Sequence, residues 1–469
     1  MSDKTDPGFD AGGYPEEIGN LMLTQCAVSG CHNEISAQAA AGLDLSTWDR
    51  LFEGTRNNAA VVPFRPDQSF LMFFVNSDPD FGPALTPNMP LNGAPLSRNV
   101  VATIRDWILQ GAPNDRGEVK FSGDPQREKV YICNQGCDLV TVIDRETRLI
   151  MRYVDVGASP DIESPHMVRV APDGRFWYTC FIAGNVFQQF STETDELVGE
   201  VNIGEGSWNT FAITADSKIA FVVDLSFTGK VAVVDLESMT LLTTYQGSGL
   251  LNSPHGSTLH PTEPILYVTA QIGNFIYKID YTDIQAPDIE ELSLVPGQSP
   301  NTVSSLDPHE VAVSPDGSRY FVTCQGSNEV RVFNTTTDAL EAAIPVGGFP
   351  QEMAFSTSQP HLFVTNMEDD VSFPGTVGTV SVIDYESLTE VTRLAPGFQP
   401  HGIAVDDRSR VVYVVNRNAS LGGPAPHHTT DCGGRNGFLT LIDMNTLELD
   451  PDYKAELSVD PYNVDIRFQ

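Results

Sequence analysis

The pattern of apolar and polar positions divides the chain at about residue 129. In residues 97–113, "SRNVVATIRDWILQGAP", apolar side chains recur three or four positions apart, which is the spacing of one helix face. Gly111 is a typical end signal for such a helix. Residues 14–26, "YPEEIGNLMLTQC", show the same spacing. The pattern therefore predicts a helical region over residues 14–113.

Beyond residue 129, short apolar segments alternate with turn signals such as Asp-Gly. A unit of about 45 residues repeats there. "SPHMVRVAPDGRFWYTC" begins at residue 164, and the similar "DPHEVAVSPDGSRYFVTC" begins at residue 307. Apolar positions with a period of two, joined by tight turns, predict antiparallel strands.

We count seven units, whose inner strands begin near residues 164, 207, 253, 307, 349, 399 and 460. The first strands, "KVYICNQG" and "LVTVID", have no inner strand of their own, so we expect the C-terminal "DPYNVDIRF" to complete their sheet. Closure of this kind joins the two ends of a β-propeller and leaves few exposed edges. The repeats predict an all-β seven-bladed propeller over residues 129–469, closed by the C-terminal strand.

These repeats resemble the YVTN family of seven-bladed propellers. "FVTN" at 363–366 and "YVVN" at 413–416 stand close to the family signature, and "VSVIDYESLTEV" matches its third and fourth strands. The resemblance implies the fold but says little about function, because propellers host many chemistries.

The chain is strongly acidic, with 62 acidic and 27 basic residues and a formal net charge of −35. This charge disfavours nucleic acid and anionic membranes as partners. It suits a well-solvated surface or the steering of a cationic redox partner. No apolar run reaches about 18 residues, so we expect no transmembrane segment. The polar residues 1–13 are expected to be a flexible tether, following a signal peptide or lipoprotein leader that is absent from this chain.

A compact motif, "TQCAVSGCHNE", lies at residues 24–34. Cys26 and Cys31 are followed directly by His32, which allows three interpretations. A zinc site needs four ligands, and no second Cys/His pair lies nearby. A local disulfide leaves His32 without a role. Haem attachment uses all three residues, through two thioether bonds and one axial imidazole, although the usual motif has only two residues between its cysteines.

Met89 could supply the second axial ligand, because "TPNMPLNGAPLS" places it in a proline-rich loop and methionine is a common haem c ligand. Residues 14–113 resemble the small cytochrome c domains of the planctomycete and myxobacterial type, through "LDLSTWDRLFEG", "VVPFRPDQSFL", "MPLNGAPLS" and "IRDWILQGA". The resemblance implies one covalent haem c held by Cys26, Cys31, His32 and Met89. We therefore expect a small all-α cytochrome c domain over residues 14–113, followed by a linker over residues 114–128.

Four inner strands begin with Pro-His, which places His166, His255, His309 and His401 at one level of the propeller. The other three blades carry Asn209, Gln351 and Tyr462 at this level. Proline suits the first position of a strand, but it does not explain the histidines. If they face the central funnel, the four imidazoles could hold a transition metal, with copper favoured. The alternative is that each histidine hydrogen-bonds or packs against the neighbouring blade.

Other residues are expected on the same face of the propeller. The long insertion 416–437 adds His427 and His428 as weaker metal candidates. Cys137 and Cys432 lie on loops of blades that meet at the ring closure, so we expect a disulfide between them. The cysteines at the ends of second strands are expected to be small buried apolar residues: Cys133, Cys180 and Cys324.

These features predict an exported haem c oxidoreductase, periplasmic or extracellular, with substrate redox chemistry at the propeller funnel. Electrons would pass through the haem to a partner protein or carrier. The order of the two regions resembles that of periplasmic nitrite reductases, and the propeller resembles the copper propellers of nitrous oxide reductase and thiocyanate dehydrogenase. The alternative is a non-catalytic electron-transfer or binding protein, in which the propeller is a scaffold or a docking surface.

Overall fold

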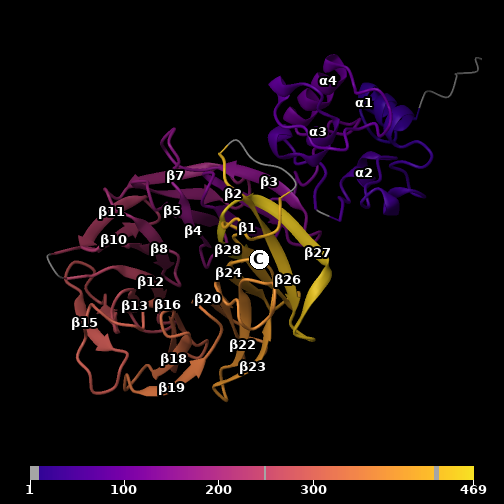
Figure 1. Ribbon diagram of the computed structural model, residues 1–469. Helices are drawn as coiled ribbons and strands as arrows, with labels where there is room; N and C mark the ends of the chain where they lie inside the picture. Colours follow the sequence, from indigo (N-terminus) through magenta and orange to yellow (C-terminus); the bar gives the residue numbers. More distant parts are fainter. Residues whose placement is uncertain (1–9, 57, 248–249, 427–431, 469) are drawn as a thin grey trace, which may run out of the picture.

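Residues 129–468 form seven four-stranded antiparallel sheets arranged around one axis (Figure 1). The computed structural model describes residues 10–56, 58–247, 250–426 and 432–468. The predicted seven-bladed β-propeller is confirmed. The second and third strands of the blades are buried almost along their whole length, because each blade packs against a neighbour on both of its faces.

Each blade consists of four strands that follow one another from the inner edge to the outer edge. Blade 1 contains β28 (Pro461–Arg467), β1 (Lys129–Asn134), β2 (Leu139–Asp144) and β3 (Ile150–Asp155), and blade 2 contains β4 (Pro165–Val170), β5 (Phe176–Phe181), β6 (Val186–Ser191) and β7 (Leu197–Asn202). Blade 3 contains β8 (Trp208–Ile213), β9 (Ile219–Asp224), β10 (Lys230–Asp235) and β11 (Thr240–Tyr245), and blade 4 contains β12 (Pro254–Leu259), β13 (Ile265–Ala270), β14 (Phe275–Asp280) and β15 (Asp288–Ser293). Blade 5 contains β16 (Pro308–Val313), β17 (Arg319–Cys324), β18 (Glu329–Asn334) and β19 (Leu340–Pro345), and blade 6 contains β20 (Pro350–Phe355), β21 (His361–Asn366), β22 (Thr379–Asp384) and β23 (Thr389–Leu394). Blade 7 contains β24 (Pro400–Asp406), β25 (Val411–Asn416), β26 (Asn436–Asp443) and β27 (Glu448–Val459).

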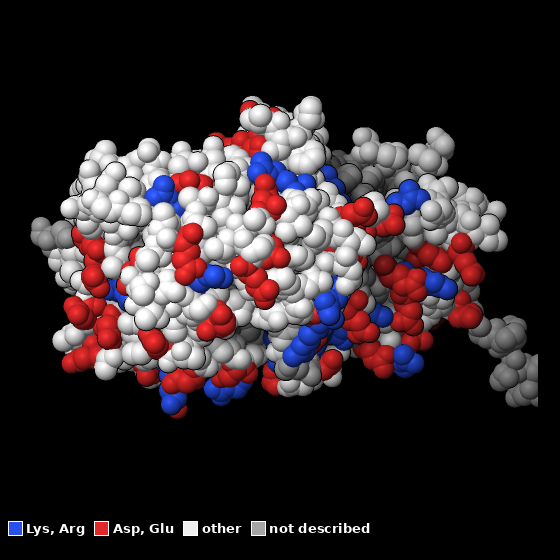
Figure 2. Space-filling model, turned by 90° about the horizontal axis from the view of Figure 1, so that it is seen from below, with Lys and Arg blue, Asp and Glu red and all other residues white. Residues whose placement is uncertain are grey.

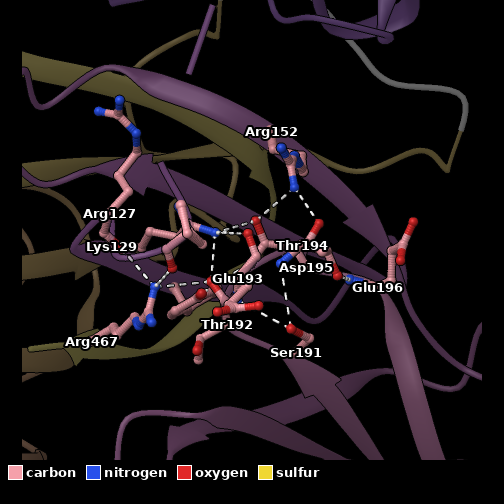
Figure 3. A network of polar contacts seen from close by, with 12 residues as sticks. Arg127, Lys129, Arg152, Ser191, Thr192, Glu193, Thr194, Asp195, Glu196 and Arg467 are labelled. Carbon is pink, nitrogen blue, oxygen red and sulfur yellow. Dashed lines mark hydrogen bonds and ion pairs between the residues drawn. The ribbon is translucent and has the colours of Figure 1, made fainter. Parts of the chain in front are cut away.

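The C-terminal strand closes the ring as predicted, because β28 pairs antiparallel with β1. A buried polar network reinforces this closure on the side of blade 2 (Figure 3). The Lys129 ammonium donates to the Asp195 carboxylate at 2.8 Å and to the Thr192 carbonyl at 2.8 Å. Arg467, near the end of β28, donates to the same Thr192 carbonyl at 3.1 Å. The first and last strands of the propeller are thereby tied to one turn, between β6 and β7.

The N-terminal region, which we define as the described residues from 10 to 128, lies beside β3 and β27 (Figure 1). Its α-helices are α1 (Glu16–Leu21), α2 (Trp48–Leu51), α3 (Phe70–Val75) and α4 (Arg98–Leu109). A π-helical turn, η1 (Met22–Cys26), follows α1, and 3-10 turns form η2 (Ala37–Ala39), η3 (Pro66–Gln68) and η4 (Pro79–Phe81). The helix expected in residues 97–113 is present as α4.

The expectation of a separate, all-α cytochrome c domain is wrong. Helices are few and short in the described part of the N-terminal region, and most of that region consists of turns and irregular chain between prolines and glycines. Its buried side chains also do not form a core of their own. Trp107 belongs to the same apolar cluster as Tyr131 and Trp177 of the propeller, and Val62 packs in a cluster with Leu441.

Candidate functional site

A β-bulge at the start of each inner strand turns one side chain toward the propeller axis. In all seven blades, the pairing between the inner strand and its neighbour shifts register just after the first residue. The second residue of the strand has no partner in the hydrogen-bond ladder. It also does not follow the regular alternation of side chains, which would direct it toward the next blade. This second residue is the predicted ring position, so the bulge is what brings the histidines together.

Five of these side chains form a closed ring around the axis, which we call the axial ring: His166, His255, His309, His401 and Tyr462. The centroid distances between successive rings are 6.3, 4.1, 5.7, 3.7 and 4.1 Å, in this order and back to His166. All five residues are buried, with 0–8% of their surface exposed. The structure thus brings the four sequence-predicted histidines together, and the fifth member is the tyrosine contributed by the closing strand.

Two histidines of the axial ring are oriented by the next blade. His255 Nδ1 lies 3.1 Å from the His309 carbonyl oxygen, and His401 Nδ1 lies 3.0 Å from the Tyr462 carbonyl oxygen. A carbonyl can only accept, so both Nδ1 atoms carry the proton and both Nε2 atoms carry a lone pair. Each of these histidines precedes a glycine, and a Cβ on Gly402 would stand 2.6 Å from the Tyr462 carbonyl oxygen. The Pro-His-Gly sequence therefore allows two blades to approach closely.

The axial ring is neutral and poorly hydrogen-bonded. Burial lowers the pKa of His255 to about 4 and holds the pKa of the other three histidines well below the ordinary value, helped by the positive charge of Arg417. Arg417 lies with its guanidinium 4.7 Å from the Tyr462 ring centroid and pairs with Asp460 at 2.7 Å. Several buried polar atoms around the axis find no hydrogen-bond partner among the described residues: both nitrogens of His166, Nδ1 of His309, Nε2 of His401 and both amide atoms of Asn209.

The structure gives no support to the predicted copper site. Among the described residues, no group of three or more His, Cys, Asp or Glu side chains is arranged to hold a metal ion. The imidazoles instead pack against one another and against Tyr462. The weaker candidates His427 and His428 lie outside the described residues.

Sequence reasoning missed a group of buried and half-buried ionisable side chains on the inner strands. Glu310 and Glu352 directly follow the ring positions of β16 and β20. Arg169 lies three residues after the ring position of β4, and Asp465 lies three residues after that of β28. Burial raises the pKa of Glu352 to about 7, and burial together with the charge of Glu352 raises that of Glu310 well above its usual value. Arg169 opposes both shifts. The available signal was a glutamate at the third position of two inner strands, β16 and β20, directly after the ring residue.

The strand-end cysteines are buried, as expected of small apolar residues. Cys133, Cys180 and Cys324 are 0% exposed, and burial raises the pKa of Cys133 and of Cys324 to about 12. The Cys133 thiol donates to the His166 carbonyl at 3.3 Å. In the same way, the Thr269 hydroxyl donates to the His309 carbonyl and the Thr365 hydroxyl to the His401 carbonyl. These side chains join neighbouring blades close to the axial ring.

The Cys-x4-Cys-His segment forms a tight loop at the end of η1. The His32 amide donates to the Cys26 carbonyl at 3.1 Å, which draws the two ends of the loop together. Cys26 and Cys31 are half-buried and not disulfide-bonded, and burial together with the Cys31 thiol raises the pKa of Cys26 to about 11. Burial lowers the pKa of His32, and its Nδ1 has no well-formed hydrogen bond.

Met89 lies at the edge of the apolar cluster that Cys26 also borders. The loop that carries it is anchored to the end of α3, because the Met89 amide donates to the Phe74 carbonyl at 2.7 Å and the Asn88 side chain donates to the Asn76 carbonyl at 2.8 Å. Met72 and Met22 are fully buried in the cluster. Of these three methionines, Met89 is therefore the one with its side chain partly open to a bound group.

Cys137 and Cys432 form a disulfide in the structure, with their Cα atoms 5.4 Å apart. This distance is ordinary for such a bond. The disulfide lines a groove of about 500 Å³ between the propeller and the N-terminal region, together with Arg65, Phe81 and Arg105. The bond links the loop between β1 and β2 to the long insertion of blade 7.

Comparisons with known proteins agree with the fold. The model of a family described as "Lactonase, 7-bladed beta-propeller" matches residues 187–421, half of the chain. The chain belongs to this family. Among curated proteins, this lactonase-family propeller is 23% identical to Antigen Lp49 of Leptospira interrogans over 261 residues, which cover 52% of this chain and 44% of that protein. It therefore matches less than half the length of that relative.

Two solved structures share the architecture of this lactonase-family chain. The dihydro-haem d1 dehydrogenase NirN, solved in complex with DHE, has a TM-score of 0.51 and 14% identity, covering 92% of this chain and 97% of that one. A functionally unknown protein from Desulfotomaculum acetoxidans has a TM-score of 0.54 and 13% identity, covering 72% of this chain and 98% of that one. At these identities the likeness shows the fold alone.

Among its described residues, the lactonase-family chain has no helix that is both long and apolar enough to cross a membrane. Its acidic side chains are scattered over much of the face seen in Figure 2, with basic side chains lying among them. The absence of nucleic acid among its partners stays a prediction, as do the domain boundaries and the haem and propeller roles of individual residues.

Proposed function

We propose that the chain is an exported c-type haem oxidoreductase in which Cys26 and Cys31 bind one haem covalently and His32 and Met89 are its iron ligands. The observation that carries the proposal is the loop of residues 26–32: two half-buried, unbridged thiols and an imidazole, bordering the same apolar cluster as Met89. Two thiols, one imidazole and one thioether are the donor set of a c-type haem. When bound, the haem accepts and releases one electron.

The haem proposal does not require a separate cytochrome domain. Cys26, Ala27, Leu43 and Met89 are all partly buried and pack against one apolar cluster, and we expect the haem to cover these side chains. This cluster continues into blades 1 and 2 through Tyr131 and Trp177. The proposed haem region and the propeller would therefore form one continuous structure.

We place substrate chemistry at the mouth of the propeller axis, beside the axial ring. Support comes from the buried neutral imidazoles, the unpartnered polar atoms around them and the Arg417–Asp460 pair next to Tyr462. The name of the similarly folded NirN, a dehydrogenase, is in keeping with a redox role. Copper is not part of this proposal.

A second candidate is a non-catalytic electron-transfer or binding protein whose propeller is a scaffold. The close packing of the axial ring favours it, because rings with centroids 3.7–4.1 Å apart at three of its five contacts leave little room on the axis. Export is proposed for either candidate, because haem c attachment requires it, and the disulfide of Cys137 and Cys432 is in keeping with an oxidising compartment.

The haem proposal is tested by exporting the protein from cells that mature c-type haem. The polypeptide should then keep its haem on a denaturing gel. Cys26→Ser and Cys31→Ser should each abolish or strongly reduce the retained haem, whereas the matched thiol variant Cys180→Ser should keep it. Equal haem retention in all three variants would refute the assignment.

The two candidate roles of the propeller are separated by the haem-loaded protein. Metal and cofactor analysis, followed by a screen of small redox substrates, is compared between the wild type and the His309→Ala/His401→Ala variant. Turnover that the double variant loses supports the oxidoreductase. The scaffold role is supported if the protein carries haem as its only cofactor, turns over no substrate in the screen, and shows no difference in these measurements between the wild type and the double variant.

A further inference from the structure

Exposed apolar side chains lie close in sequence to the proposed haem ligands. Ile35 is 94% exposed, Leu91 58% and Val28 37%. Val28 lies between the two cysteines of the motif, Ile35 lies three residues after His32, and Leu91 lies two residues after Met89. Large exposed apolar side chains on loops that also carry proposed ligands are candidates for a surface that meets a partner.

The backbone beneath Val28 and Ile35 is held by hydrogen bonds, so their exposure belongs to the folded loop. The Asn33 side chain donates to the Val28 carbonyl at 2.7 Å, and the Ile35 amide donates to the Asn33 side chain at 3.1 Å. The Gly30 amide donates to the Ser36 hydroxyl at 3.1 Å. The loop therefore presents both apolar side chains outward on a fixed frame.

The charges that border the first loop are acidic, and Arg98, which follows the second loop, is paired with Asp78 and Asp80. Residues 24–33 and 81–97 contain no charged side chain at neutral pH. The nearest exposed charges along the chain before and after the first loop are Glu16, Glu17 and Glu34, and none of them forms an ion pair with another described residue. Arg50, which feels the charge of Glu34, is paired with Glu53 at 2.9 Å. Along the chain, the unpaired charges nearest the motif are therefore negative, and the nearest basic group held against this segment is Arg56, which donates to the Gln38 carbonyl at 2.7 Å.

We propose that Val28, Ile35 and Leu91, with Glu16, Glu17 and Glu34 at their border, form a docking surface for a small basic electron-carrier protein. The inference rests on the proposed haem. The acidic side chains would steer the cationic carrier toward the motif, and the uncharged loops would let the two proteins approach closely at the haem edge. One electron passes between the carrier's haem iron and the haem of this chain, so that one iron is oxidised as the other is reduced. Short-lived contacts of this kind need only a small interface.

The test follows electron transfer from a reduced small basic cytochrome c to the haem-loaded protein by stopped-flow absorbance. The bimolecular rate constant is measured at about 10 mM and about 200 mM ionic strength, where the screening length falls from about 30 Å to under 10 Å. We expect the wild-type rate constant to fall by about tenfold or more. The Glu16→Gln/Glu17→Gln/Glu34→Gln variant should lose most of this salt dependence.

A control variant separates local steering from the overall charge of −35. Glu237→Gln/Glu386→Gln/Glu448→Gln removes three exposed acidic charges from propeller turns and a strand end, and should keep most of the wild-type salt dependence. Ile35→Ser should lower the rate constant at both ionic strengths without changing their ratio. An acidic cytochrome of similar size should react slowly and speed up with salt.

Two outcomes would overturn the docking proposal while leaving the haem in place. One is a covalent haem spectrum with a salt-independent rate, and the other is an equal loss of salt dependence in the border and control variants. A chain without covalent haem would refute the proposed function, and the docking surface with it. The haem spectrum of every variant is therefore recorded before the kinetics.

Discussion

Lys129 is a buried cation at the closure of the propeller, and Lys129→Met removes its charge while keeping a side chain of similar length. The ammonium lies 2.8 Å from the Asp195 carboxylate, and the two side chains are 2% and 0% exposed (Figure 3). It also donates to the Thr192 carbonyl at 2.8 Å. Burial lowers the pKa of Lys129, while the Asp195 carboxylate opposes that shift. The variant leaves the carboxylate and the carbonyl buried without this donor.

The expected loss of stability follows from what remains around Asp195. Removing one partner of a buried ion pair costs about 3–5 kcal/mol. The Arg152 guanidinium still lies 2.9 Å from the carboxylate, and the Tyr131 hydroxyl still donates to it at 2.9 Å. Because these two donors compensate in part, we expect the lower end of that range, about 3 kcal/mol.

Urea unfolding followed by tryptophan fluorescence is a suitable assay, since the Trp177 ring centroid lies 5.2 Å from that of Tyr131, beside the network. The matched control is Lys278→Met, whose ion pair with Asp338 has nearly the same length, 2.9 Å, but leaves the two side chains 21% and 23% exposed. The control should lose about 0–1 kcal/mol.

A second variant tests the same reasoning from the anion. In Lys129→Met/Asp195→Asn, the buried carboxylate that has lost its lysine is itself removed, and asparagine tolerates the left-handed φ of 60° at this position. This double variant should recover much of the lost stability. Equal losses in Lys129→Met and Lys278→Met would refute the reasoning.

Three further changes test other parts of the structure. Glu352 has its pKa raised by burial from 4.5 to about 7. Its stabilising contribution is therefore full below about pH 4.5 and is lost as the pH rises to about 7. Over this pH range, the free energy of unfolding in urea should fall more for the wild type than for Glu352→Gln. Parallel pH profiles of the two proteins would contradict this. Cys137→Ala, which breaks the disulfide with Cys432, should cost about 2–4 kcal/mol, and dithiothreitol should then destabilise the wild type but not the variant. Gly402→Ala places a Cβ 2.6 Å from a backbone oxygen and should cost about 1–3 kcal/mol, whereas Gly247→Ala, with its nearest contact at 3.7 Å, should change the thermal midpoint little; similar midpoints for both would contradict the clash.

The propeller was predictable because its units repeat. Each unit carries the same order of apolar strands and tight turns, so an error in one unit is corrected by the other six. The closing role of "DPYNVDIRF" followed from counting the strands of the first sheet. The prediction that the N-terminal region is all-α failed because local patterns, such as that of α4, do not show how much of the intervening chain is irregular. They also do not show that Trp107 and Val62 pack against propeller residues.

The axial ring could be predicted in its composition but not in its geometry. Strict alternation places His309 on the same side of its strand as Val311 and Val313, which would point it toward the next blade. The bulge after Pro308 breaks that alternation, and a bulge is set by how neighbouring blades approach. Glu310 and Glu352 were overlooked for a related reason, because a charged residue is not expected inside a closed ring of blades.

The most direct measurement is the absorbance spectrum of the purified, denatured protein after export from cells that attach c-type haem. We predict one covalently bound haem per chain, retained by Met89→Ala with a changed axial-ligand signature in the folded protein and lost or strongly reduced in Cys26→Ser. A chain that folds with a native circular dichroism spectrum and carries no covalent haem would contradict the proposed function.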